Sequence, residues 1–250
     1  MSESYRALTS DFYVNLKLQV KMDLPRSRET VLDLFERLRR QYPTMSQFRR
    51  YKDELALESA QNGAEAHRWV AVRSNSIRAG SVNTQTVGEA YTYHKQVLEA
   101  APFYLNVSPI DIEYVELLYG FDIMAGGNHD AIVYEALYAG SPLAGLGEHE
   151  GLSLVDCQPM IGFTLPDEKG ELQVHFEVKT HPSGTAKRDG EASAQPISIY
   201  LTLRRFGSIH DIHELGGILD DLARHGEELL EARVLPKLVI PIRQAAGLNG

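Results

Sequence analysis

Cysteine and long apolar runs are scarce in this chain of 250 residues. Because Cys157 is the single cysteine, no disulfide can form within the chain, and we expect a structural thiol in a reducing compartment. No stretch approaches the roughly eighteen uninterrupted apolar residues of a membrane span, and residues 1–5 show no basic segment before an apolar one. These absences predict a soluble, cytoplasmic protein without a membrane partner.

Basic residues are also fewer than acidic residues. The chain has 25 lysines and arginines against 34 aspartates and glutamates, for a formal net charge of −9. Proteins that neutralise nucleic-acid phosphates or lie on anionic lipid need a basic surface, so we expect neither partner. The hydrophobic share of 43% and the charged share of 24% are ordinary for a globular protein with a sizeable core.

Strict alternation is the clearest positive signal. From Phe12 to Leu24 every even position is apolar, while the odd positions are mostly polar. This pattern indicates a long β-strand with one buried face and one wet face. Similar patterns return over Ile110 to Met124, over Glu171 to Thr180 and from Ile197 to Leu203. One-sided strands predict an antiparallel sheet that is covered on a single face.

Helical spacing follows the long strands. Ser27 stands where an N-cap is expected, ahead of a helix that reaches about Arg40. Thr84 or Thr86 can cap a second helix, which we expect to end before Pro102.

Between these helices, Trp69 with Ala71 and the run Ile77 to Val82 indicate two short strands separated by a tight turn at Ser74-Asn75. The order of elements in this first part is therefore strand, helix, strand pair, helix.

Other segments are less clear in their pattern. Residues 48–57 suggest a second helical piece or an irregular excursion, and residues 152–165 suggest a strand paired with 171–180. A long helix with an apolar stripe is expected over 215–232. The tail Val234 to Ile242, with its two prolines, fits either a kinked helical extension or an edge strand.

The same order of elements occurs twice, over 12–101 and over 110–232. The sequence therefore predicts an α+β protein of two similar halves, each an antiparallel sheet of long one-sided strands with helices packed on one face. We place the halves at residues 1–105 and 106–250 and expect them to pack as one compact unit. An internal duplication is a hypothesis that follows from this order.

Two stretches carry a resemblance to a known family: the long central strand from Tyr114 to Ile123, and the closing unit Ile197 to Arg204 followed by residues 215–242. In its order of elements the chain resembles an uncharacterised, sporadically distributed bacterial family of two-part α+β proteins. The resemblance covers most of the chain. It implies no activity and no catalytic residues.

Histidines supply the main enzymatic candidate. His210 and His213 stand three residues apart with carboxylates between and after them, and a metal site would need His129 or His149 as a further ligand. Gly217 occupies the position where the zinc-protease motif places its second histidine. Capping of the helix start by Asp211 and Glu214 is the simpler explanation of the carboxylates.

Catalytic motifs are otherwise missing: neither a nucleophile elbow nor a lysine with serine or threonine after Gly140–Gly147 is present. We therefore expect no cofactor, and the sequence leans away from an enzyme. Tyrosines are frequent in the middle of the chain and suit pocket walls and interfaces. The candidates for a ligand or interface surface are Tyr91, Tyr93, Tyr104, Tyr114, Tyr119, Tyr134 and Tyr138.

Three functional hypotheses follow. The first is a non-catalytic binding module whose tyrosine-lined surface accepts a protein partner or a second copy of the chain. The second is a cavity for a small apolar ligand between the long helix 215–232 and the sheet of the second half. The third is a metal-dependent enzyme that uses His210 and His213 with His129 or His149.

Overall fold

The computed structural model describes residues 5–25, 27–60, 66–147, 151–152, 154–165, 171–180 and 195–248. Nine strands in this part of the chain form a single antiparallel sheet in the order β2-β3-β4-β5-β1-β6-β9-β8-β7. The strands are β1 (Asp11–Val20), β2 (Met45–Arg50), β3 (Leu55–Ser59), β4 (His67–Val72), β5 (Ser76–Val82), β6 (Ile112–Ile123), β7 (Met160–Leu165), β8 (Glu171–Lys179) and β9 (Ile197–Phe206). The helices are α2 (Arg28–Gln41), α3 (Val87–Tyr104), α4 (His129–Tyr138), α5 (Glu214–Leu229) and α6 (Ile240–Ala245), with the shorter or irregular turns η1 (Pro109–Asp111), η2 (Ala144–Gly147) and η3 (Leu230–Val239).

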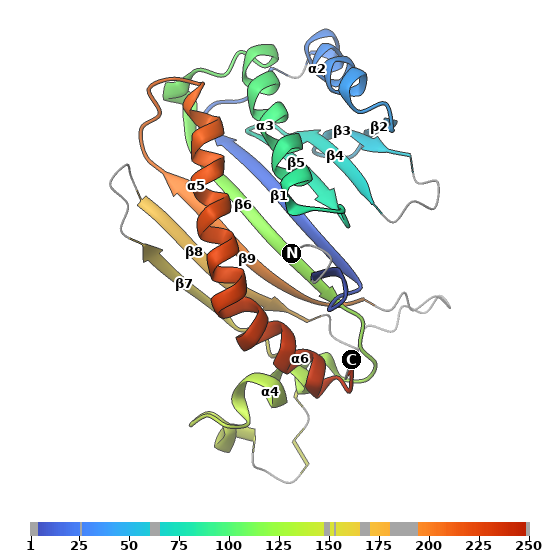
Figure 1. The fold of residues 1–250 in the computed structure, drawn as a ribbon, viewed down its shortest axis with the longest axis vertical. Helices are drawn as coiled ribbons and strands as arrows, with labels where there is room; N and C mark the ends of the chain where they lie inside the picture. Colours follow the sequence, from blue (N-terminus) through green and yellow to red (C-terminus); the bar gives the residue numbers. More distant parts are fainter. Residues whose placement is uncertain are drawn as a thin grey trace.

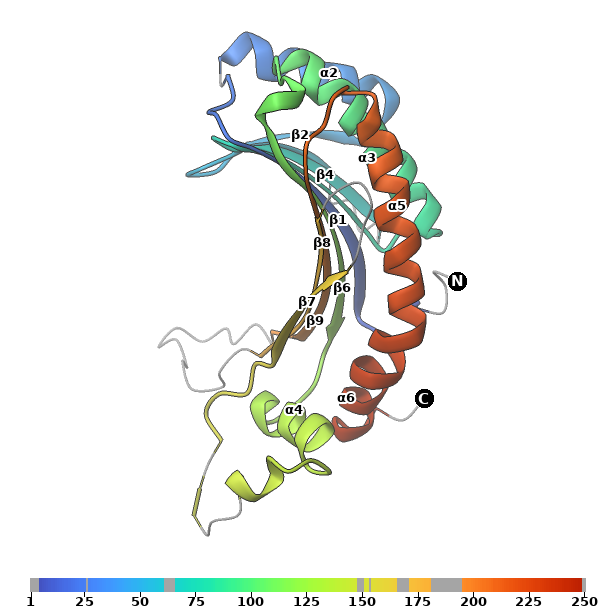
Figure 2. The same ribbon diagram turned by 90° about the vertical axis from the view of Figure 1, so that its left-hand side faces the viewer.

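The sheet is curved, and α3, α5 and α6 lie on its convex side (Figures 1 and 2). Helix α2 lies at one end of the molecule and α4 at the other (Figure 1). The even residues of β1 are almost fully buried toward the helices, whereas its odd residues face the opposite side. One-sided covering of an antiparallel sheet agrees with the predicted α+β class.

Strand β1 ends at Val20, four residues before the predicted Leu24. Its register with β6 shifts between Gln19 and Val20, and the backbone N–H of Lys21 donates to the carbonyl of Asp111 at 2.8 Å. A bulge of this kind bends a strand and ends regular pairing. The chain bends at Lys21 and Met22, and Met22 is 69% exposed, so the alternation in the sequence continues past the end of the strand.

The segment 48–57 is not helical, which corrects one prediction. It forms the hairpin of β2 and β3, in which Phe48 pairs with Leu57. The few apolar residues of this segment fit both the helical spacing and the alternation of a strand. Pairing of β3 with the neighbouring strand β4 decides in favour of the strand. The predicted strand over 152–165 is also shorter than expected, because only Met160–Leu165 is paired.

Helix α3 begins after Thr86, whose side chain accepts a hydrogen bond from the N–H of Glu89. It continues through Pro102 to Tyr104, so the prediction that it stops before the proline is wrong. Proline in the last turn loses one backbone hydrogen bond. The buried face formed by Tyr93, Val97 and Ala101 holds the helix against the sheet despite that loss.

The tail is helical. Helix α5 runs directly into the π-helical segment η3 and then into α6, so the edge-strand alternative for residues 234–242 is excluded. Pro236 and Pro241 lie inside this stretch, and neither has a backbone N–H to donate. A π-helix has wider turns than an α-helix and occurs where the regular backbone hydrogen bonding of a helix is interrupted.

The order of strands is similar on the two sides of the β1–β6 pair. Strands β5 and β4 follow β1 in the sheet as β9 and β8 follow β6, and α2 succeeds β1 in the chain as α4 succeeds β6. Leu16 faces Leu117 where the two central strands meet. The sheet is thus continuous between the two halves, while the boundary at residue 105 stays a prediction.

Among the helices in the described part of the chain, none has both the length and the apolar character needed to cross a bilayer.

Candidate interaction surface

Strand β7 forms one edge of the sheet, and its sequence Met-Ile-Gly-Phe-Thr-Leu contains no charge. Three of its side chains are strongly exposed: Met160 at 60%, Ile161 at 56% and Phe163 at 53%. No strand in the described residues pairs with its outer side. An exposed, uncharged apolar edge is a template for pairing with another chain.

The backbone of β7 also has a defined outer side. The N–H of Val178 donates to the carbonyl of Pro159 at 2.9 Å, so position 159 faces β8. Hydrogen-bonding direction alternates along a strand. The N–H and C=O groups of Met160, Gly162 and Thr164 therefore point away from β8 toward the free edge.

The chain leading into β7 adds further apolar surface. The exposed residues there are Leu143 at 47%, Leu146 at 76%, Leu152 at 62% and Val155 at 77%. The Tyr134 hydroxyl lies 2.9 Å and 2.8 Å from the carbonyl oxygens of residues 143 and 144, which fastens η2 to α4. We call Met160, Ile161 and Phe163, together with these four residues, the apolar edge surface.

Asp130 holds this part of the chain against the sheet. Its carboxylate is buried and accepts hydrogen bonds from the N–H of Cys157 at 2.9 Å and from the Thr180 hydroxyl. One carboxylate thus joins α4, the segment before β7 and the end of β8. Burial, followed by the charges of Asp130 and Asp156, raises the pKa of the Cys157 thiol, which makes this thiol a poor nucleophile at neutral pH.

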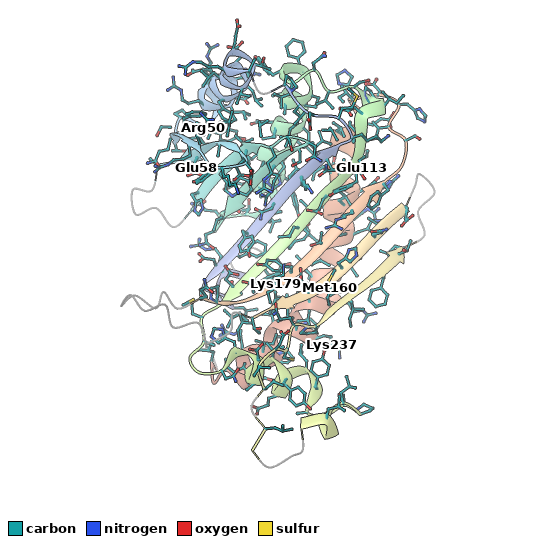
Figure 3. The ribbon with its side chains drawn as sticks, turned by 180° about the vertical axis from the view of Figure 1, so that it is seen from behind. Arg50, Glu58, Glu113, Met160, Lys179 and Lys237 are labelled. Atoms are coloured by element: carbon teal, nitrogen blue, oxygen red, sulfur yellow. The ribbon has the colours of Figure 1, made fainter. Side chains whose placement is uncertain are left out.

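The opposite edge of the sheet, β2, has a different character. Its sequence ends in Arg49 and Arg50, and charged side chains on an edge strand oppose pairing with a second copy. Figure 3 shows Arg50 at one end of the molecule and Met160 well separated from it along the open face. The two edges are therefore chemically distinct.

The open face of the sheet is flattened by aromatic rings that lie over glycines. A Cβ at Gly120 would overlap the ring of Tyr13, and a Cβ at Gly80 would overlap that of Trp69. Both pairs are direct cross-strand partners. The rings consequently cover the backbone at these two glycines, and Trp69 also lines a shallow hollow of about 360 Å³ beside β3 and β4.

Charges on the open face largely satisfy one another. Glu116 forms an ion pair with Arg204 from the neighbouring strand, and the Lys17 ammonium donates to the Tyr114 hydroxyl at 2.8 Å. Lys179 lies 3.2 Å from a Glu177 carboxylate oxygen. A face with such internal pairing is typical of a solvated surface, so the apolar edge surface is the stronger candidate.

The predicted tyrosines do not gather on one surface. Tyr93 and Tyr119 are fully buried, and the hydroxyls of Tyr91 and Tyr119 lie 2.6 Å apart between α3 and the sheet. Burial, helped by the charge of Glu227, raises the pKa values of Tyr91 and Tyr119, so both stay protonated.

The remaining four tyrosines are partly exposed and occupy three places. Tyr104 ends α3, and Tyr114 lies on the open face against Phe206, with ring centroids 5.1 Å apart. Tyr134 and Tyr138 lie in α4, with ring centroids 5.8 Å apart. Those two are the predicted tyrosines that adjoin the apolar edge surface.

The predicted histidine ligands are also separated. His210 and His213 precede α5 at one end of the molecule, whereas His129 opens α4 at the other (Figure 1). The Nε2 atom of His129 lies 2.9 Å from the Ala125 carbonyl oxygen. His149 lies outside the described residues, and the described part of the chain contains no group of three or more histidine, cysteine, aspartate or glutamate side chains placed to hold a metal.

Capping accounts for the carboxylates near His213. Its N–H donates to the Asp211 carboxylate at 2.9 Å, and the N–H of Asp211 donates to the Glu214 carboxylate at 3.1 Å. This reciprocal pattern satisfies two backbone donors at the start of α5.

The interface between α5 and the sheet is close-packed at its centre. Tyr119 lies directly beneath Gly226, where a Cβ would come within 2.6 Å of the tyrosine hydroxyl oxygen. Leu219, Leu222 and Leu230 on the same helix face are at most 2% exposed. This close packing does not support the predicted cavity for a small apolar ligand at the centre of the interface between α5 and the sheet.

Neither a protein-family profile nor a curated protein matches this chain. A solved structure, the crystal structure of the di-domain ARO/CYC BexL from the BE-7585A biosynthetic pathway, aligns with 95% of this chain and 99% of its own, at 9% identity and a TM-score of 0.26. A TM-score of this size does not establish a shared fold.

The residues of β7 were not among the predicted site residues. A signal for them exists in the sequence, because Met160–Leu165 is an uncharged apolar strand flanked by Pro159 and Pro166. Its position at the edge of the sheet depends on how nine strands are ordered, which residue spacing does not report.

Proposed function

We propose that this protein is a non-catalytic interaction module that associates with a second copy of itself through the apolar edge surface. The observation that carries the proposal is strand β7, an edge strand with three strongly exposed apolar side chains and no charge. Isolated exposed apolar residues are common on proteins, but three exposed apolar side chains within one uncharged edge strand are typical of an interface.

A second copy fits this edge because the strand is self-complementary. In an antiparallel pair centred on Gly162, Met160 of one copy faces Thr164 of the other, and Ile161 faces Phe163. The facing pairs bring apolar side chains together on the helix side of both sheets. Hydrogen bonds from the outward N–H and C=O groups would make the two sheets continuous.

Charge supports the choice of this edge over the other. Two copies with a net charge of −9 each repel one another, so a contact surface without carboxylates is the least unfavourable place to meet. Two β2 strands in the same arrangement would bring Arg49 and Arg50 of both copies together.

Light scattering coupled to size exclusion, over a series of concentrations, tests the proposal. The wild-type protein is expected to approach twice the chain mass, and Phe163→Lys is expected to stay at the mass of one chain. Phe103→Lys is the matched control, because Phe103 is 81% exposed on α3, away from β7. It should behave as the wild type.

Thr164→Pro separates strand pairing from side-chain contact. It removes an outward N–H while leaving the hydrogen bonds to β8 in place, so it should weaken the dimer with an unchanged circular dichroism spectrum. A wild type that remains monomeric throughout, or a Phe163→Lys variant that dimerises as the wild type does, would refute self-association by this edge.

We also propose that the two halves arose by internal duplication within the bacterial family that the chain resembles. The similar order of strands and helices on either side of the β1–β6 pair supports the duplication. The metal-enzyme alternative receives less support, because His129 lies at the opposite end of the molecule from His210 and His213.

A further inference from the structure

A second surface with its own chemistry lies at the other edge of the sheet. Helix α2 and strands β2 and β3 enclose a half-open groove of about 740 Å³, within the size range of ligand sites. Its apolar lining comes from Val31 and Leu32 of α2, from Leu55 of β3 and from Phe48, whose side chain is 50% exposed. The exposed half of the Phe48 side chain is therefore available to pack against an apolar group of a ligand.

Among the described residues, the charged lining of this groove is exclusively basic. Arg28, Arg50 and Lys52 line it, and no carboxylate does. None of the three has an ion pair or a side-chain hydrogen bond to any other residue in the described part of the chain. Elsewhere on the first half, arginines such as Arg39 and Arg73 are paired with glutamates at 3.1 Å and 2.7 Å. Within the described residues these three cations have no such partner, so their positive charge remains available to an acidic ligand beside the apolar lining.

Some backbone groups of β2 are also directed toward the free edge of the sheet beside this groove. The N–H of Tyr51 donates to the Glu54 carbonyl, so position 51 points toward β3. By alternation, the N–H and C=O groups of Phe48 and Arg50 point to the free edge. The two residues that line the groove with their side chains therefore also offer their backbone to an added strand.

We propose that this groove binds an acidic, amphipathic peptide segment of a partner protein in an extended conformation. Its carboxylates pair with Arg50 and its basic neighbours, an apolar side chain packs on Phe48, and its backbone adds to the edge of β2. The apolar lining distinguishes such a segment from nucleic acid, whose phosphates need the cations alone. This binding is independent of self-association through β7.

Fluorescence anisotropy with a labelled peptide of about eight residues that alternates glutamate and leucine is a direct probe. We expect wild-type protein to bind it and added salt to weaken the binding. Arg50→Glu should weaken it by at least about tenfold, because it replaces an attraction with a repulsion. Arg39→Glu is the matched control, since Arg39 belongs to the same helix as Arg28 but does not line the groove, and it should leave binding unchanged.

Three comparison probes make the proposal falsifiable. Equal binding of a lysine–leucine peptide, equal binding of a glutamate–serine peptide, or equally effective competition by oligothymidylate would each overturn it. Unchanged binding by Arg50→Glu would overturn it as well. Running the series in the Phe163→Lys background keeps the outcome separate from that of the β7 surface.

Discussion

His94 is the side chain whose burial has the clearest energetic consequence. It belongs to α3, its ring is fully buried, and neither ring nitrogen has a hydrogen-bond partner within the described residues. The ring of Tyr93 packs against it, and the Arg68 guanidinium lies nearby. Desolvation, followed by the charge of Arg68, lowers the pKa of His94 from 6.5 to about 3.

This lowered pKa predicts acid sensitivity. The unfolded chain binds a proton at His94 below pH 6.5, whereas the folded protein does not until about pH 3. The stability associated with neutral His94 is therefore complete above pH 6.5 and is lost progressively as the pH falls toward 3. From pH 7 to pH 5 the loss should be roughly 2 kcal/mol.

Urea unfolding of the wild type and of His94→Leu at both pH values measures this contribution. The leucine variant should keep its stability at neutral pH, because it also removes two unpaired buried nitrogens, and it should lose less on acidification. Parallel losses in the two proteins would show that His94 does not carry the effect.

Helix α5 shows how one residue type has opposite effects along a single element. It contains Gly216, Gly217 and Gly226 on its sixteen residues, although glycine disfavours helices. Nothing lies within 4 Å of a Cβ at Gly217, whereas a Cβ at Gly226 would meet the Tyr119 ring. Only Gly226 is therefore required by packing.

Alanine substitutions at the two positions should differ in sign. Gly226→Ala should lower the free energy of unfolding by roughly 1–3 kcal/mol, because the helix must move away from Tyr119. Gly217→Ala should raise it by roughly 0.5–1 kcal/mol through helix propensity. Urea denaturation gives both values, and destabilisation of equal size at the two positions would contradict the packing argument.

The β1–β6 pair lies in the middle of the sheet and joins the two predicted halves. These strands pair from Asp11 with Asp122 to Gln19 with Tyr114, and they are the only direct strand pairing in the described sheet between the predicted halves. Separating the halves would expose two long edges whose helix-facing residues are buried in the intact protein.

We therefore expect the halves to fold only together. Fragments 1–105 and 106–250, divided beside Asn106 in the turn after α3, should each lack a cooperative thermal transition. Mixing them should restore the near-ultraviolet circular dichroism of the intact protein. A cooperative transition in either isolated fragment would instead show that the halves are autonomous domains.

Much of the local structure is readable from the residues themselves. Alternation places β1, β6, β8 and β9, and the side chains of Ser27 and Thr86 start α2 and α3 as expected. These signals are local, because burial of one face and satisfaction of the first backbone donors depend on neighbours in the chain. Local signals fail at Phe48, where a short apolar pattern fits two periods, and at Pro102, where tertiary burial outweighs a break.

The sequence by itself thus determined the α+β class, the one-sided strands and the absence of recognisable catalytic motifs. Only the tertiary structure decided that β7 and β2 are the edges of the described sheet, that three cations around Phe48 have no partner among the described residues, and that His129 lies far from His210. The physical reason is that strand order and edge exposure arise from pairing between distant segments. Spacing along the chain carries no record of that pairing.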